Sequence, residues 1–276
     1  MKLENITPGP AGRIDFDAFL DVDPAAGRVR VRREALTDPA IFDLEMRHIF
    51  EGGWIYLAHE SQLPERFDFY TDWMGRQPVI VYRNGEGAID VFLNACPHRG
   101  TTLCRTRQGK RKGFACTYHG WAFDDQGQLV FVPRRDEGYP ADFDMAAHGL
   151  VRAARVEHYG GFIFASLNPQ VVPLREHLGD LLEVIDMLND QAPGGFEVVK
   201  GFNTCTYRGN WKLLLENGSG GTAARLACNA DCARAVSRPL PEPASSRRRV
   251  RSAVSDCRAM VRSATAIWAL AEQASA

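Results

Sequence analysis

The chain has 276 residues, of which 45% are hydrophobic, and its formal net charge is -1. That length is enough for one large domain or two ordinary ones, and the hydrophobic share is that of a packed globular core. A charge so close to neutral gives no overall electrostatic case for binding nucleic acid or an anionic membrane. The composition therefore predicts a folded protein whose partners are small molecules or other proteins.

The sequence carries no signal for export or membrane insertion. Its first residues lack an apolar core behind a basic start, and no later run approaches the roughly 20 apolar residues of a membrane span. Seven cysteines form an odd number at irregular spacings, which indicates thiols or metal ligands and not a disulfide framework. We expect a cytoplasmic protein.

The chain begins with an irregular segment and a helix. Residues 1–36 are rich in Pro, Gly, Asp and Arg with little periodicity, and predict an N-terminal arm. Asp38 and Pro39 then form an N-cap and N1 pair, and apolar residues recur at helical spacing until Gly52 and Gly53. The pattern predicts one amphipathic helix of about a dozen residues.

The period then changes to that of β-strands. Short segments rich in aromatic and β-branched residues alternate with turns, of which 84–87 and 124–127 are the clearest hairpin signals. These segments predict a compact antiparallel β domain over 37–168. The expected strands are WIYLAHES, PVIVYR, AIDVFLN, FACTYHGWAF, QLVFV and GGFIFASLN.

A second helical pattern follows Pro173, and it precedes a strand pattern, FEVVKGFNTCTY, and a further helix, GNWKLLLENG. Residues 169–217 are therefore predicted to start a second domain, which makes the fold class α+β. One face of the first helical pattern holds Leu178, Leu181, Leu182, Ile185 and Leu188.

Two short cysteine and histidine pairs are the strongest chemical signal. Cys96 and His98 form a C-x-H pair, and Cys116 and His119 form a C-x-x-H pair in a later turn. A Rieske-type [2Fe–2S] cluster has two thiolates on one iron and two imidazoles on the other. Two loops that each supply one cysteine and one histidine meet that need, so we predict a cluster that accepts electrons.

A structural zinc site uses the same ligand types and is the competing interpretation. Each loop here mixes one Cys with one His, whereas zinc ribbons and fingers usually pair like with like. Cys104 lies between the two pairs, and we interpret it as a small core residue.

With CPHRG at 96–100 and CTYHGW at 116–121, the sequence resembles the large (alpha) subunits of Rieske non-haem iron aromatic-ring-hydroxylating dioxygenases. HIFEGGWIYLAHESQLP, MGRQPVIVYRN, IDMLNDQAP and GNWKLLLENG look most like the branch that oxidises benzoate, toluate, halobenzoate and anthranilate. The resemblance covers about residues 36–218.

The resemblance implies a Rieske domain inserted in a helix-grip type catalytic domain, which is incomplete here. It implies a flavin and [2Fe–2S] reductase that uses NADH, a small (beta) subunit in a hetero-oligomer, and an aromatic carboxylate that undergoes cis-dihydroxylation with O2. Arg99, Tyr118 and Trp121 are expected to pack around the cluster and tune its hydration.

The family's mononuclear Fe(II) lies in a site of two histidines and one carboxylate. Its first signature, Asp, Gly, Tyr and His, follows ENG directly, but here ENG is followed by SGGTA. Gly220 therefore stands at the position of the bridging aspartate, and Ala223 at that of the first histidine ligand. No histidine follows His177 in the sequence, so we expect no mononuclear iron site and no ring hydroxylation.

From 218 to 276 the composition turns to Ala, Arg and Ser, with Trp268 as the single aromatic residue. A shift of reading frame or a rearrangement near codon 218 would explain this tail, which we expect to be disordered. A genuine tail with Cys228 and Cys232 as ligands is the alternative. The remaining histidines have no second ligand at i+3 or i+4, and we assign none of them to iron. They are His48, His59, His148, His158 and His177.

Two further functions stay open for the chain. One is a stand-alone Rieske electron carrier, and the other is a zinc-stabilised interaction module.

Overall fold

The computed structural model describes residues 19–23, 25–192, 194–199, 201 and 208–219. Its described residues divide into two compact units, 40–198 in the first, and 19–39 with the described residues from 199 to 219 in the second. No helix among these residues is long and apolar enough to cross a membrane. The domain boundaries at 36, 168 and 217 stay predictions.

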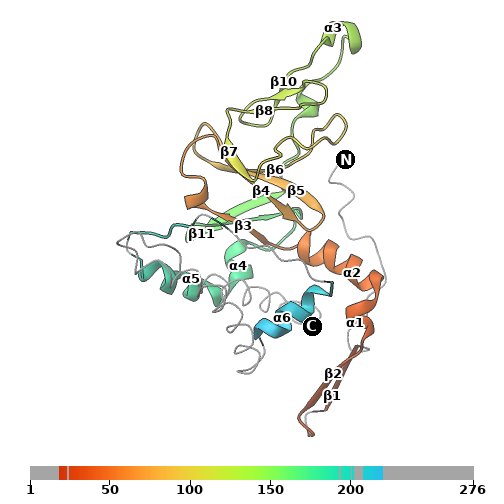
Figure 1. Ribbon diagram of the computed structural model, residues 1–276, viewed down its shortest axis with the longest axis vertical. Helices are drawn as coiled ribbons and strands as arrows, with labels where there is room; N and C mark the ends of the chain where they lie inside the picture. Colours follow the sequence, from red (N-terminus) through yellow and green to blue (C-terminus); the bar gives the residue numbers. More distant parts are fainter. Residues whose placement is uncertain (1–18, 24, 193, 200, 202–207, 220–276) are drawn as a thin grey trace, which may run out of the picture. The chain divides into compact units, whose positions relative to one another are not determined.

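The first unit is built on three antiparallel sheets (Figure 1). Their strand orders are β6-β5-β4-β7, β11-β12-β3 and β10-β9-β8. The strands are β3 (Ile55–His59), β4 (Asp68–Met74), β5 (Gln77–Arg83), β6 (Ile89–Leu93), β7 (Gln108–Lys110), β8 (Phe114–Ala115), β9 (Ala122–Phe123), β10 (Leu129–Phe131), β11 (Arg155–Tyr159) and β12 (Phe162–Ser166).

The four-stranded sheet is buried on both faces. Successive side chains of a strand point to opposite faces, and on β5 this sends Ile80 and Tyr82 into one hydrophobic core and Val79 and Val81 into another. The first core also contains side chains of the small sheet β10-β9-β8, and the second contains side chains of β3 and β12. The central sheet therefore joins the small sheet to the rest of the unit.

The two predicted hairpin turns are confirmed. The turn at 84–87 joins β5 to β6, and the turn at 124–127 joins β9 to β10. In the first, the Asn84 side-chain oxygen accepts hydrogen bonds from two backbone N–H groups. In the second, Asp124 does the same. Short polar side chains that bond their own backbone are what make such turns stable.

The helix predicted after Asp38 is also present. It begins at Pro39 as α2 (Pro39–Glu45) and continues as the π-helical segment η3 (Met46–Phe50). A Cβ atom on Gly52 would lie 2.6 Å from the carbonyl oxygen of Arg47, so only glycine fits where the helix ends. The sequence pattern did not distinguish the π segment from ordinary helix.

The second helical pattern forms two helices and not one. Gly179, with φ +48°, separates α4 (Leu174–Leu178) from α5 (Leu181–Asp190). Both helices contribute to a core that also contains Trp54, which precedes β3, and Phe164 of β12. Short helical turns occupy connections elsewhere in this unit. They are η4 (Glu60–Gln62), α3 (Arg135–Gly138) and η5 (Ala146–His148).

The strand predicted for FEVVKGFNTCTY is wrong where it can be checked. Residues 196–199 form no strand, and 202–207 lie outside the described residues. The Val198 N–H instead donates to the Ser61 hydroxyl at 3.0 Å. A segment with β-branched residues needs a neighbouring strand to become one, and the sequence alone does not reveal that neighbour.

The described part of the second unit contains a hairpin and two helices. Strands β1 (Leu20–Asp23) and β2 (Arg28–Val31) pair antiparallel within the segment expected to be irregular, and α1 (Glu34–Thr37) follows. The predicted last helix is confirmed as α6 (Trp211–Ser219). The Asn210 side-chain amide donates to the Leu36 carbonyl at 3.1 Å and so joins the region before α6 to α1.

Candidate cluster-binding site

The first cysteine and histidine pair lies in a loop that follows β6. The Cys96 N–H donates to the Thr101 carbonyl at 2.8 Å, and the Gly100 N–H donates back to the Cys96 carbonyl at 2.8 Å. Gly100 has φ +73°, in the left-handed region that side chains disfavour. These two bonds curl residues 96–101, which we name loop 1, into a tight turn.

The second pair lies in a loop with the same backbone pattern. The Cys116 N–H donates to the Trp121 carbonyl at 2.8 Å, and the Gly120 N–H donates to the Cys116 carbonyl at 3.0 Å. Gly120 has φ +72°. Residues 116–121, which we name loop 2, therefore repeat loop 1 although the histidine stands one residue later.

The strand predicted over FACTYHGWAF is therefore wrong as a continuous element. It consists of the two-residue strands β8 and β9, with loop 2 between them. Phe114 pairs with Phe123 and Ala115 with Ala122, so the two strands form the base of a hairpin whose tip is loop 2. The hairpin tip that the C-x-x-H spacing suggested is thus present.

The four side chains of interest meet as two pairs. The thiols of Cys96 and Cys116 are buried and lie next to each other in one cluster of the core. The rings of His98 and His119 have their centroids 4.7 Å apart and lie at 70°. Within the described parts of the chain, no three or more Cys, His, Asp or Glu side chains gather as one group around a single point. A pair of like donors from two loops is the arrangement that a two-iron cluster takes.

The two kinds of donor in this site differ in their electrostatics. Burial raises the pKa of the Cys96 thiol, and the neighbouring Cys116 raises it further. Burial lowers the pKa of His98, with the charges of His119 and Arg99 acting in the same direction. A neutral imidazole is the form that binds metal, whereas the thiols must lose protons, so metal binding would release protons here.

Aromatic side chains surround the histidine pair. The Trp121 ring, buried in the core, stacks on His98 at 4.9 Å between centroids with an angle of 8°. Tyr118 is 59% exposed, and the centroid of its ring lies 3.8 Å from that of the His119 ring. Arg99 is exposed beside His98. Arg99 and Tyr118 adjoin the two histidines in the sequence, and Trp121 contacts His98 from the far end of loop 2. Their role in tuning a cluster stays a prediction.

Sequence reasoning missed two residues that hold this arrangement. The buried Asn94 bonds the backbone of Leu103 and Cys104 through its side chain. The Trp121 Nε1–H donates to the Tyr139 hydroxyl at 3.2 Å. Asn94 stands two residues before Cys96, but its partners are backbone groups, which leave no trace in a sequence.

The other candidates have structural roles or lie elsewhere. Cys104 is buried in the hydrophobic core, and burial raises its pKa to about 11, which agrees with its interpretation as a core residue. His59 Nδ1 lies 2.9 Å from the Ser61 hydroxyl, and His158 Nδ1 lies 2.7 Å from a Glu60 carboxylate oxygen. The positions expected to matter for iron or as tail ligands fall outside the described residues. They are Gly220, Ala223, Cys228 and Cys232.

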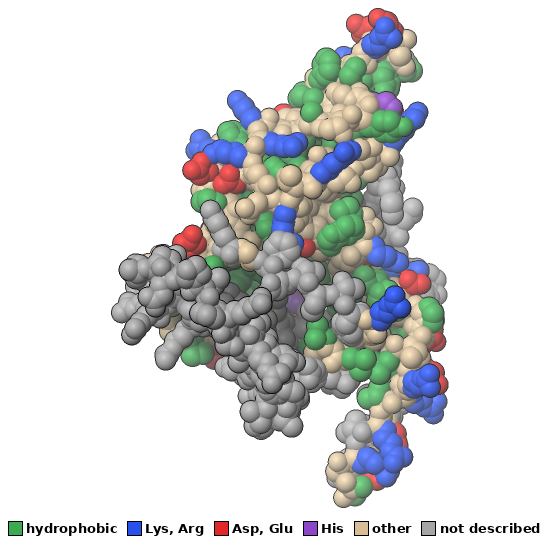
Figure 2. Space-filling view, viewed as in Figure 1, with side chains coloured by type: hydrophobic (Ala, Val, Ile, Leu, Met, Phe, Trp, Pro, Cys, Tyr) green, Lys and Arg blue, Asp and Glu red, His purple; other side chains and the backbone are tan. Residues whose placement is uncertain are grey.

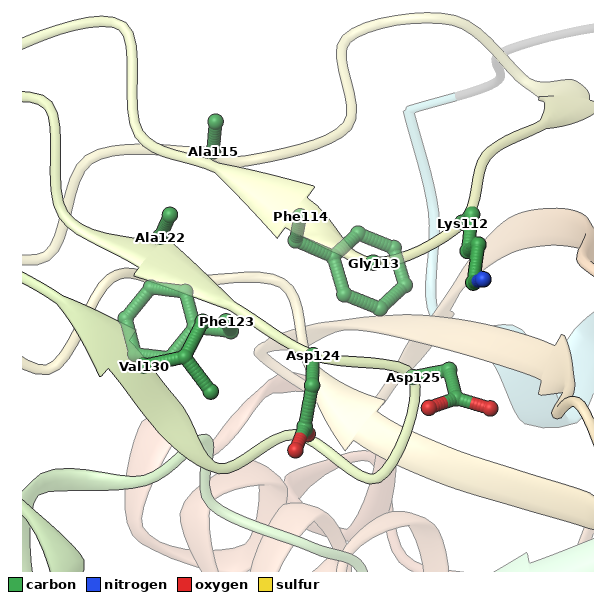
Figure 3. Close-up of a pocket in the computed structure, with 9 residues that line it drawn as sticks. All are labelled: Lys112, Gly113, Phe114, Ala115, Ala122, Phe123, Asp124, Asp125 and Val130. Carbon is green, nitrogen blue, oxygen red and sulfur yellow. The ribbon is translucent and has the colours of Figure 1, made fainter.

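A shallow depression of about 400 Å³ lies over β8 and β9 (Figure 3). Phe114, Phe123 and Val130 line it together with Lys112 and the turn residues after β9. Its carboxylate at Asp125 already accepts a hydrogen bond from the Gly85 N–H at 2.8 Å. No residue of the two cysteine and histidine pairs lines this depression, so the depression is separate from the candidate site.

The antiparallel sheets and the two matching loops define a Rieske-type protein. Residues 53–154 match the family described as the Rieske [2Fe-2S] domain. Together with the relatives below, this domain shows that the chain belongs to the Rieske aromatic-ring dioxygenase large subunits.

Among these relatives, the toluate 1,2-dioxygenase subunit alpha of Pseudomonas putida is 50% identical over 75% of this chain and 46% of its own length. The 2-halobenzoate 1,2-dioxygenase large subunit of Burkholderia cepacia is 45% identical over 72% of this chain and 43% of its own length. A crystal structure of naphthalene 1,2-dioxygenase from Rhodococcus sp. bound to indole gives a TM-score of 0.68 at 33% identity, covering 76% of this chain and 48% of that one. The chain thus spans less than half the length of these relatives.

Proposed function

We propose that Cys96, His98, Cys116 and His119 bind a Rieske [2Fe–2S] cluster and that the protein accepts electrons there. The observation that carries this proposal is the repetition of one backbone hydrogen-bond pattern in two loops, which brings thiol to thiol and imidazole to imidazole. A single tetrahedral zinc ion needs all four donors around one point. Two pairs on two irons fit the arrangement better.

When bound, such a cluster supplies one-electron chemistry at a potential well above that of an all-cysteine ferredoxin, because two ligands are neutral imidazoles. The protein's own residues position and shield it. The buried Trp121 stacks on His98 and fixes the plane of that ring. The thiols lie in the core, where water has little access. His98 and His119 lie nearer the surface, so electrons would enter on the histidine side.

We further propose that the chain derives from the large subunit of a benzoate-type 1,2-dioxygenase of the cytoplasm. The toluate, halobenzoate and anthranilate enzymes, at 43–50% identity, support this branch. The intact enzyme would receive electrons from NADH through a flavin and [2Fe–2S] reductase, associate with a small subunit, and dihydroxylate an aromatic carboxylate.

For this 276-residue chain we propose electron uptake without ring hydroxylation. Gly220 and Ala223 stand where the family's motif has an aspartate and a histidine, and neither glycine nor alanine has a metal-binding side chain. A stand-alone Rieske electron carrier is the second candidate function. The complete cysteine and histidine set, which needs no residue after 121, favours it.

Metal content and spectroscopy test the cluster. Protein purified without oxygen should contain two irons and two sulfides per chain, as a [2Fe–2S] centre requires. When reduced, it should give an EPR signal with the low average g value of histidine ligation. His119→Ala should abolish that signal, whereas His158→Ala, at a histidine outside the loops, should leave it unchanged. Zinc in place of iron would support the interaction module.

Turnover tests the oxygenase part separately. The chain, mixed with a reductase and small subunit of a benzoate-type enzyme, should form no cis-diol from benzoate while its cluster is still reduced. Product that increases in proportion to this chain, in preparations free of any full-length relative, would contradict the proposal.

A further inference from the structure

The segment that links the two loops is strongly basic. From Ala95 to Phe123 the sequence contains no Asp or Glu, although the whole chain has 34 acidic and 33 basic residues. Basic residues occur in loop 1, in the stretch after it and around β7. They are Arg99, Arg105, Arg107, Lys110, Arg111 and Lys112, which we name the basic surface.

All six of these side chains belong to exposed residues. Figure 2 shows several Lys and Arg side chains over the region that Figure 1 labels β7 and β8. Strand β7 is an edge strand, where a charged residue also prevents unwanted strand pairing. That explanation covers Lys110 but not Arg99 or Arg105, which lie outside any strand.

Most of this positive charge has no acidic partner among the residues that the structure describes. Lys110 is paired with Glu65, and the Arg107 Nε–H donates to the Tyr70 hydroxyl at 2.7 Å. The remaining four form no ion pair with any described residue. They are Arg99, Arg105, Arg111 and Lys112.

The basic surface is attached directly to the loops. The Arg105 guanidinium donates to the Thr117 hydroxyl at 3.3 Å, which keeps its charge beside loop 2. Arg99 is exposed and follows His98 directly in loop 1. Tyr118, between Thr117 and His119, adds an exposed aromatic ring. An exposed aromatic residue with charges around it is typical of a protein-binding surface.

We propose that the basic surface and Tyr118 form the docking site for an acidic electron-donor protein. This inference rests on the proposed function, because it needs a cluster at the two loops. One electron would leave the reduced donor, which is oxidised by one electron, and would be taken up at the histidine side. No covalent bond forms or breaks. Opposite charges would steer the donor to this face and speed association at low salt.

Stopped-flow reduction of the cluster-loaded protein tests the proposal. The donor is a reduced plant-type [2Fe–2S] ferredoxin, an acidic protein whose reduction potential lies well below that of Rieske centres. In the variant Arg105→Gln/Arg111→Gln/Lys112→Gln, the second-order rate at low salt should fall about tenfold, within the range that electrostatic steering supplies. The native rate should decrease as salt is added, and the variant rate should depend less on salt.

A variant with the same change of net charge is the control. Arg32→Gln/Arg33→Gln/Arg175→Gln removes three exposed cations that are not part of the basic surface, and its rate should equal the native rate. Equal slowing in both variants, or a native rate that does not respond to salt, would overturn the docking site.

Dithionite separates this inference from the proposed function. It is too small to need a docking surface, so it should reduce the cluster fully in all three proteins. Failure in the native chain would overturn the cluster and, with it, the docking site. Full reduction by dithionite without any charge effect on the ferredoxin rate would overturn the docking site alone. Tight binding of a labelled single-stranded oligonucleotide at physiological salt, with no charge effect on the ferredoxin rate, would assign the surface to nucleic acid and also overturn it.

Discussion

Loop 1 and loop 2 share one backbone pattern but are supported in different ways. Loop 1 is supported by the buried side-chain amide of Asn94. This amide, just before the loop, forms hydrogen bonds with the backbone of Leu103 and Cys104, just after it. Loop 2 has strands at its base and a buried Trp121 at its end. Similar turns can thus be stabilised either by polar bonds or by packing, and the two supports should respond differently to substitution.

Removal of the loop 2 support should have the largest effect. Trp121 is almost fully buried and contacts the rings of His98, Tyr139 and Phe143. We expect Trp121→Ala to lower the free energy of unfolding by about 3–5 kcal/mol, the usual cost of deleting a buried tryptophan. Urea unfolding followed by circular dichroism measures this cost.

Trp121→Phe is the matched control for that substitution. It keeps an aromatic ring that can stack on His98 but loses the hydrogen bond to Tyr139. Its cluster content should stay close to native, while that of Trp121→Ala should decrease. If both variants retain full cluster content, the stacked ring does not help to hold loop 1 and loop 2 together.

The loop 1 support gives the second prediction. Asn94→Leu leaves three backbone groups of Leu103 and Cys104 without their partner. Unpaired buried groups cost about 1–3 kcal/mol each when nothing replaces the bond, so we expect the free energy of unfolding to fall by about 3 kcal/mol or more. We also expect a shifted EPR spectrum and reduction potential, because the geometry around Cys96 and His98 should change.

Asn84 provides the control for Asn94. It is also buried, and its side chain makes three hydrogen bonds, but these stabilise the turn from β5 to β6. Asn84→Leu should reduce the free energy of unfolding by a similar amount without a change in the potential. Equal shifts of the potential in both variants would mean that Asn94 acts through general stability alone.

The two loop glycines give the third prediction. Both have positive φ, which costs an L-residue about 1–2 kcal/mol. A Cβ on Gly100 would meet nothing within 4 Å, whereas one on Gly120 would lie 2.8 Å from Pro133 Cγ. Gly120→Ala should therefore destabilise the protein more than Gly100→Ala, as measured by urea midpoints at constant slope. Equal midpoints would show that Pro133 moves aside freely.

The sequence indicated the two cysteine and histidine pairs and the hairpin turns because these depend on local spacing. Strands β4 and β11 were missed, since Asp72 and His158 interrupt their apolar patterns. Both strands are stabilised by pairing with partners elsewhere in the sheets, which single-strand periodicity does not report. Asn94 was missed for the same reason: its importance comes from backbone groups that return after the loop.

Tyr82, a tyrosine on β5, gives the smallest expected effect on stability. Tyr82 is fully buried, its hydroxyl donates to the Arg111 carbonyl at 2.9 Å, and the Gly113 N–H approaches that hydroxyl at 3.4 Å. It thus holds the segment that leads into β8. We expect Tyr82→Phe to cost about 1 kcal/mol, the net value of a typical hydrogen bond.

The pH dependence of this effect has a definite sign. Burial raises the pKa of Tyr82 to about 12 from 10.0, and the nearby carboxylates raise it as well. The folded protein therefore holds the phenolic proton more tightly than the unfolded chain does. The contribution of Tyr82 to stability should be fully present below pH 10 and should be lost as the pH rises toward 12. Urea unfolding between these pH values should show a steeper loss for the native protein than for Tyr82→Phe, and parallel losses would mean that the phenol reaches solvent before the fold opens.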